Sequence, residues 1–150
     1  MKLLFIMATL LISLVAFSQS LPDFDFEAAN GKKVNKSVLA KEKPVLIVYF
    51  DPYCDHCEWQ AQTIKENAEK FRDINMIWVS WEQDEPNQEF FDKYLSGFKY
   101  AIVCKDFKFM IDTWFGYSEV PSIFCYNSKW EWVATFSKEQ PAHVLLKALE

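Results

Sequence analysis

Residues 44–57, Pro-Val-Leu-Ile-Val-Tyr-Phe-Asp-Pro-Tyr-Cys-Asp-His-Cys, decide the fold of this chain. Their first part, Pro44–Phe50, is a continuous apolar run, which is typical of a strand buried on both faces. A short turn, Asp51–Tyr53, follows it and places Cys54 at the N-terminal edge of the next element. That element is predicted to be an amphipathic helix, because apolar residues recur at intervals of three and four: Cys57, Ala61, Ile64, Ala68 and Phe71.

Cys54 and Cys57 are separated by two residues at the predicted start of this helix. Unpaired backbone N–H groups and the helix dipole favour an anion there, so we expect the pKa of the Cys54 thiol to fall. Two cysteines at this spacing close a disulfide across one helical turn and open it again. The motif therefore predicts a redox pair, with a permanent local disulfide as the alternative.

Residues 1–18 are predicted to be a secretory signal peptide, and residues 19–150 to form one domain. A single basic residue, Lys2, precedes an apolar run, and Ala16 and Ser18 supply small residues at a cleavage site. The run is shorter than the roughly 20 residues that a membrane-spanning helix needs. We therefore expect an exported protein, periplasmic or extracellular. A membrane-tethered protein with an uncleaved signal anchor is the alternative.

The composition limits the class of protein further. The formal net charge is −5 and there is no basic cluster, which argues against binding to nucleic acid or to an anionic membrane. Aromatic residues make up 17% of the chain and glycines number only three, which favours a packed core over a disulfide scaffold. Cys104 and Cys125 are therefore expected to be buried thiols, although a second disulfide between them is the alternative in an oxidising compartment.

The rest of the pattern predicts alternating strands and helices. Further strands are expected at residues 74–81, 100–104, 122–126 and 130–136, the last with Trp130, Trp132, Ala134 and Phe136 on one face. Helices are expected from Asp84 onward, where Pro86 suits a first turn, and at residues 107–115 and 141–149.

Several segments in this order resemble one known family. Phe24–Glu27 and Asn30–Val34 are similar to its opening hairpin, Cys54–Cys57 to its redox motif, and Val120–Ser122 to its cis-proline segment. Over residues 22–149 the chain resembles the thioredoxin superfamily, and within it the exported thiol-disulfide oxidoreductases of the TlpA/ResA type. The resemblance implies an α/β, thioredoxin-like fold, in which a central mixed β-sheet is flanked by helices and extended by an N-terminal hairpin.

The resemblance also implies an activity. A monomer without cofactor or metal would exchange disulfides with exported protein thiols or disulfides, and a membrane or periplasmic redox partner would recycle it. Cys54 would attack a substrate disulfide and Cys57 would resolve the mixed disulfide. His56 would stabilise the thiolate and Asp55 would oppose it, giving a midpoint of roughly −150 to −230 mV. The alternative for His56 is a solvated turn residue.

Three further residues are implied in substrate binding: Tyr53, Val120 and Pro121. A cis Val120–Pro121 bond would pack against the Cys54 sulfur, and the Val120 backbone would pair with a substrate peptide in β fashion. An ordinary trans proline at the start of an edge strand is the alternative. The chain departs from the family at Val48, where thioredoxin has a buried acid. Asp51, Glu82 or water would then accept the proton of Cys57, although for each of the two acids a solvated surface charge is the favoured interpretation.

Three other functions remain open. A peroxiredoxin-like peroxidase shares the fold, but Asp51 and Ile47 stand where its signature needs a hydroxyl residue and a proline. A copper carrier would use Cys54, Cys57 and a histidine, either His56 or His143, as ligands. A non-catalytic binding module would keep the fold alone. The sequence fixes neither the substrate nor the net direction of electron flow.

Overall fold

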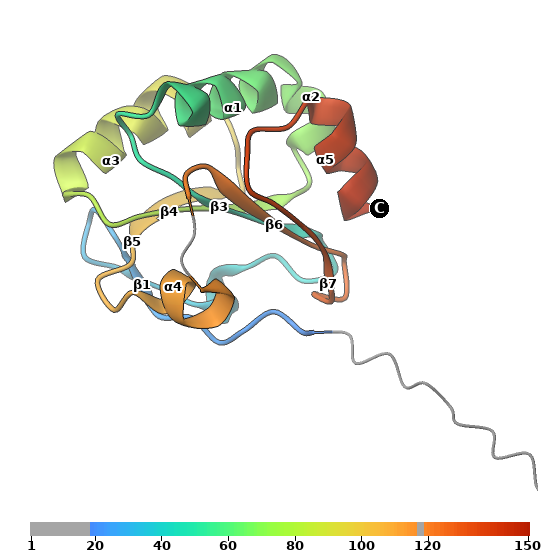
Figure 1. Cartoon of the computed structure of the whole chain (residues 1–150), viewed down its shortest axis with the longest axis horizontal. Helices are drawn as coiled ribbons and strands as arrows, with labels where there is room; N and C mark the ends of the chain where they lie inside the picture. Colours follow the sequence, from blue (N-terminus) through green and yellow to red (C-terminus); the bar gives the residue numbers. More distant parts are fainter. Residues whose placement is uncertain (1–18, 117–118) are drawn as a thin grey trace, which may run out of the picture.

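The computed structural model describes residues 19–116 and 119–150, so the predicted signal peptide lies outside the described residues. A seven-stranded mixed sheet in the order β2-β1-β5-β4-β3-β6-β7 forms its centre (Figure 1). The strands are β1 (Phe26–Ala28), β2 (Lys33–Val34), β3 (Val45–Tyr49), β4 (Asn75–Ser80), β5 (Ala101–Lys105), β6 (Ser122–Tyr126) and β7 (Trp132–Phe136). The α/β, thioredoxin-like fold and the N-terminal hairpin β1–β2 are confirmed.

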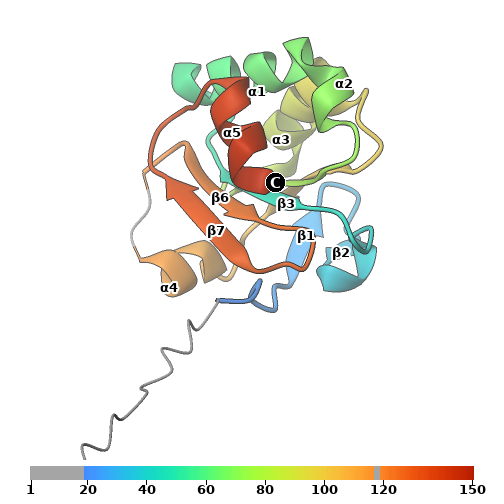
Figure 2. The ribbon, with the colours of Figure 1, turned by 90° about the vertical axis from the view of Figure 1, so that its right-hand side faces the viewer.

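Helices cover both faces of this sheet. They are η1 (Lys36–Val38), α1 (Asp55–Glu66), α2 (Ala68–Phe71), α3 (Asp84–Phe90), the π-helix η2 (Phe91–Leu95), α4 (Met110–Phe115) and α5 (Ala142–Leu149). Figures 1 and 2 show α1, α3 and α5 on one face, whereas α4 and the segment leading into β1 lie on the other.

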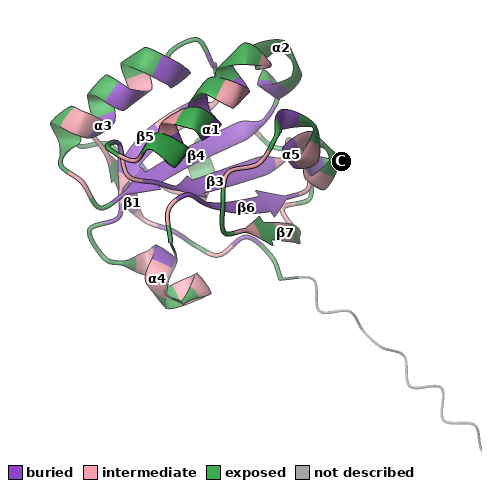
Figure 3. Ribbon diagram, turned by 45° about the horizontal axis from the view of Figure 1, so that its top comes forward, coloured by how far each residue is buried: buried purple, intermediate pink, exposed green. Residues whose placement is uncertain are grey.

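The central strand β3 is buried on both faces, as its continuous apolar sequence predicts. It pairs in parallel with β4 and antiparallel with β6. Alternate residues enter two separate cores: Leu46 and Val48 pack under α1, α3 and α5, while Val45 and Ile47 pack on the opposite side. Figure 3 shows the buried strands between helices whose outer faces are exposed.

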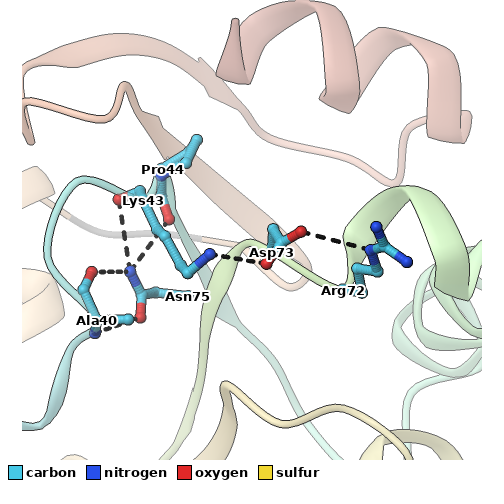
Figure 4. A network of polar contacts seen from close by, with 6 residues as sticks. All are labelled: Ala40, Lys43, Pro44, Arg72, Asp73 and Asn75. Carbon is cyan, nitrogen blue, oxygen red and sulfur yellow. Dashed lines mark hydrogen bonds and ion pairs between the residues drawn. The ribbon is translucent and has the colours of Figure 1, made fainter.

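A buried asparagine joins the N-terminal ends of β3 and β4 (Figure 4). The Asn75 side chain accepts from the Ala40 N–H at 2.8 Å and donates to the Ala40 carbonyl at 2.9 Å. Nearby, Lys43 Nζ lies 2.7 Å from Asp73 Oδ1. The hydrogen bond between them raises the pKa of Lys43 and lowers the pKa of Asp73, so it favours the charged form of both side chains. This network fixes the end of the sheet opposite Cys54.

Two details of the sequence prediction were wrong. The stripe from Cys57 to Phe71 is two helices, because Asn67 ends α1 by donating its side-chain amide to the Thr63 carbonyl at 2.9 Å, and Ala68 is exposed. The last strand begins at Trp132 and not at Trp130.

The cause in the last strand is local backbone geometry. Trp130 has a φ of +63°, a left-handed conformation that a strand does not continue through. The pairing of β6 with β7 also shifts between Cys125 and Tyr126, a bulge that leaves one extra residue in β7. Trp130 therefore packs in a different core from Ala134 and Phe136.

Candidate active site

Cys54 occupies the N-cap position of α1, at the end of the turn that follows β3. The turn before it is shaped by Asp51, whose carboxylate accepts from the Tyr53 N–H at 2.8 Å and whose carbonyl accepts from the Cys54 N–H at 3.1 Å. Cys54 itself is half-buried. Its sulfur thus sits where the first N–H groups of a helix lack backbone partners, a position that favours a negative charge.

Cys57 lies one turn further along α1 and is fully buried among core side chains. Burial is the main cause that raises the pKa of its thiol well above the usual range, and the neighbouring Cys54 raises it further. All four cysteines are free thiols in this structure. The pair therefore consists of one partly accessible sulfur and one enclosed sulfur in contact with it.

His56, between the two cysteines, contacts the carboxylate of a residue far away in the sequence. Its Nδ1 lies 2.8 Å from Oε1 of Glu139, in the segment between β7 and α5. The imidazole is 69% exposed and the carboxylate 28%. The backbone N–H of Glu139, and then His56, lower the pKa of the Glu139 carboxyl. Asp55 is exposed in the first turn of α1.

The Val120–Pro121 peptide bond is cis, as the resemblance implies. Pro121 is buried and Val120 half-buried, immediately before β6. The register pairs Ser122 with Tyr49 at the carboxyl end of β3, so Val120 and Pro121 reach the same end of the sheet as Cys54. Direct packing of Pro121 on the Cys54 sulfur remains a prediction.

Tyr53 is 72% exposed and lines a pocket of about 190 Å³ between the turn and the α3–η2 segment. Its other walls are Pro52, Glu58, Pro86, Glu89, Phe90, Lys93 and Tyr94. Lys93 Nζ lies 3.3 Å from Oε1 of Glu58, joining the two walls. Sequence reasoning found Tyr53 but missed the wall from α3 and η2, because no local pattern ties these residues to the motif.

The two proposed proton acceptors differ in position. Asp51 is half-buried and acts on Cys57 in two ways: a hydrogen bond with its backbone lowers the pKa of the Cys57 thiol, and the smaller effect of its negative charge raises it. Glu82 follows β4, where its N–H donates to Ser80 Oγ and its carbonyl accepts from Asn87. Asp51 is therefore the acidic residue that the structure brings to Cys57.

Cys104 and Cys125 lie on β5 and β6, which are separated by two strands. With strands about 4.8 Å apart, three strand spacings alone separate their Cα atoms by roughly 14 Å, twice the reach of a disulfide. Burial raises the pKa of both thiols, that of Cys125 to about 12. The alternative of a second disulfide is therefore wrong, and both are buried thiols.

Within residues 19–116 and 119–150, no three or more histidine, cysteine, aspartate or glutamate side chains are grouped as a metal site would require. In the same part of the chain, none of the helices is both long and apolar enough to cross a bilayer.

The sheet order, the cis-proline before β6 and the Cys54–Cys57 pair at the start of α1 define a thioredoxin-fold protein, which confirms the superfamily. Residues 17–113 match the model of the AhpC/TSA family, and the chain belongs to that family of thioredoxin-like oxidoreductases. No curated protein matches the sequence.

Solved structures share the fold at low sequence identity. A secreted Mycobacterium tuberculosis disulfide oxidoreductase homologous to E. coli DsbE is 16% identical, with a TM-score of 0.67 over 85% of this chain and 96% of that one. A putative thiol:disulfide interchange protein DsbE from Chlorobium tepidum is 15% identical, with a TM-score of 0.69 over 87% and 93%. The peroxidoxin BcpB from Mycobacterium tuberculosis is 15% identical, with a TM-score of 0.71 over 87% and 94%.

Proposed function

We propose that this protein is a thiol-disulfide oxidoreductase that exchanges disulfides with exported protein substrates through Cys54 and Cys57. One observation carries the proposal: a partly accessible cysteine at a helix start is in contact with a fully buried one. Exchange needs this difference in access, because one sulfur must reach the substrate disulfide while the other stays shielded until it displaces the bound substrate.

In the reducing direction, the Cys54 thiolate attacks one sulfur of a substrate disulfide. A Cys54–substrate disulfide forms, and the second substrate sulfur leaves as a thiolate that takes up a proton. Cys57 then gives its proton to an acceptor, for which Asp51 or water is available, and its thiolate attacks the Cys54 sulfur. The substrate leaves as a dithiol, and its two electrons have come from the protein pair, which is now a disulfide. The same steps in reverse oxidise a substrate dithiol.

Two sets of substrate contacts are proposed near Cys54. The Val120 backbone beside Pro121 offers hydrogen bonds to an extended peptide, which give affinity with little sequence preference. Tyr53, the residue before Cys54, offers an exposed aromatic ring. We further propose export by the signal peptide at residues 1–18, a monomeric mature protein, and recycling by a membrane or periplasmic redox partner.

The test uses single-cysteine variants in a disulfide-exchange assay, such as reduction of insulin by dithiothreitol. Cys54→Ser should abolish exchange, whereas Cys57→Ser should accumulate a mixed disulfide through Cys54 that mass spectrometry detects. Cys125→Ser is the matched control, because a buried thiol outside the pair should leave exchange unchanged. A mixed disulfide recovered through Cys57 in the Cys54→Ser variant would reverse the two roles.

A peroxidase is the second candidate, supported by the family match and by the similarity to the peroxidoxin BcpB. At the position where the peroxidase signature needs a hydroxyl group, the Asp51 carboxylate accepts a hydrogen bond from the Tyr53 N–H. An acceptor there is unsuited to donating to a peroxide oxygen. Consumption of hydrogen peroxide by the reduced protein, faster than by free cysteine, would favour the peroxidase.

A further inference from the structure

Two neighbouring residues of the segment between β7 and α5 bind the first turns of α1. Glu139 Oε1 lies 2.8 Å from Nδ1 of His56, and the Gln140 N–H donates to Oε1 of Gln60 at 2.6 Å. His56 and Gln60 are four residues apart and therefore share one face of α1. A segment about 80 residues away in the sequence is thus attached to the helix that carries both cysteines.

The two contacts differ in burial and in charge. Gln60 is fully buried, so its hydrogen bond with the Gln140 backbone holds the segment in place without help from Glu139. Glu139 adds a charge: its own backbone N–H, His56 and Lys138 all lower the pKa of its carboxyl, which stays ionised at neutral pH. The structure therefore holds a carboxylate at a fixed place against the imidazole in the redox motif.

We propose that Glu139 is a positioning residue of the redox site, which acts through His56 to favour the reduced form of the Cys54–Cys57 pair. This inference rests on the proposed function. A carboxylate held 2.8 Å from Nδ1 fixes the orientation of the imidazole ring. When it carries a proton on both nitrogens, the imidazole so placed, two residues from Cys54, stabilises the thiolate of the reduced protein.

The Glu139 carboxylate also acts directly on the thiolate, with the opposite sign. Its negative charge alone disfavours a second anion nearby, so this direct effect favours the oxidised form. Removing the carboxylate therefore has two separable consequences. The effect through His56 requires the imidazole, whereas the direct effect does not, and a double-mutant cycle distinguishes them.

The experiment measures the ratio of reduced to oxidised pair in fixed glutathione buffers. Glu139→Gln should lower this ratio two- to fourfold, the scale of a partly exposed ion pair, which corresponds to about 9–18 mV. In a His56→Asn background the same substitution should leave the ratio unchanged or raise it slightly. An equal decrease in both backgrounds, or no decrease beside His56, would overturn the inference.

A matched control removes a carboxylate elsewhere on the same side of the sheet. Glu69 lies on α2 and pairs with Arg72. It therefore lies beyond the C-terminal end of α1, a helix about 18 Å long whose other end carries Cys54. Glu69→Gln makes the same change in net charge and should leave the ratio unchanged, so an equal shift in this variant would overturn the inference. A wild-type protein without any reversible disulfide would overturn the proposed function as well, whereas a reversible wild type with an unshifted Glu139→Gln contradicts this inference alone.

Discussion

At the residue scale, the four cysteines differ in access to solvent. Cys54 is half-buried at a helix start, and the other three are enclosed in the core, where burial raises the pKa of each thiol. With iodoacetamide at pH 8, Cys54 of the reduced native protein should be alkylated at least about tenfold faster than the others, because only thiolates with access react. Peptide mapping by mass spectrometry measures the order, and first modification of Cys57 would contradict the assignment.

The titration of the Cys125 thiol makes the free energy of unfolding depend on pH in the alkaline range. Burial raises the pKa of its thiol from 9.0 to about 12, so between these values the folded state keeps a proton that the unfolded state has lost. The contribution of the Cys125 thiol to the free energy of unfolding is therefore fully present below about pH 9 and is lost as the pH rises toward 12. Cys125→Val should reduce the fall in the free energy of unfolding between pH 8 and 10 by about 1 kcal/mol.

Urea unfolding at several pH values measures this fall, with m-values compared to detect other changes. Valine suits the site because it is apolar, similar in size and cannot ionise. An unchanged pH dependence in Cys125→Val would show that the thiol does not contribute to alkaline unfolding.

At the scale of elements, the side chain of Asn75 ties β4 to the segment before β3. Asn75→Ala should lower the free energy of unfolding by about 2–4 kcal/mol, because the Ala40 N–H and carbonyl both lose their partner in a partly buried site. Chemical denaturation measures the change. Lys43→Met is the matched control: it removes the exposed ion pair with Asp73 and the contact of Nζ with the Tyr100 ring, keeps the backbone carbonyl, and should cost less than about 1 kcal/mol. Equal losses in the two variants would contradict the assigned role of Asn75.

Elements were predictable where one local signal dominates. The run Pro44–Phe50 predicts β3 because a strand buried on both faces needs apolar residues throughout. The helix break at Asn67 was not predictable from the apolar stripe, which continues across it to Phe71. The left-handed turn at Trp130 also leaves no signal in the pattern, since a tryptophan there is consistent with a strand.

At the scale of the whole molecule, the site residues that are close together in the sequence were predictable, whereas those that only the fold brings to the site were not. Cys54, Cys57 and His56 lie in one turn of chain, so spacing and helix position identify them together. Glu139 and the α3–η2 wall of the Tyr53 pocket reach the motif only through the fold. The signal for them is tertiary, and a single sequence does not carry it.

The central claim is that Cys54 and Cys57 form a reversible disulfide suited to exchange with protein substrates. The most direct measurement titrates residues 19–150 against glutathione and dithiothreitol, and counts free thiols by acid trapping and mass spectrometry. We predict one two-electron transition confined to this pair, with a midpoint of about −150 to −230 mV, absent in Cys54→Ser. A midpoint below about −300 mV, typical of a structural disulfide, or the absence of any Cys54–Cys57 disulfide, would contradict the account.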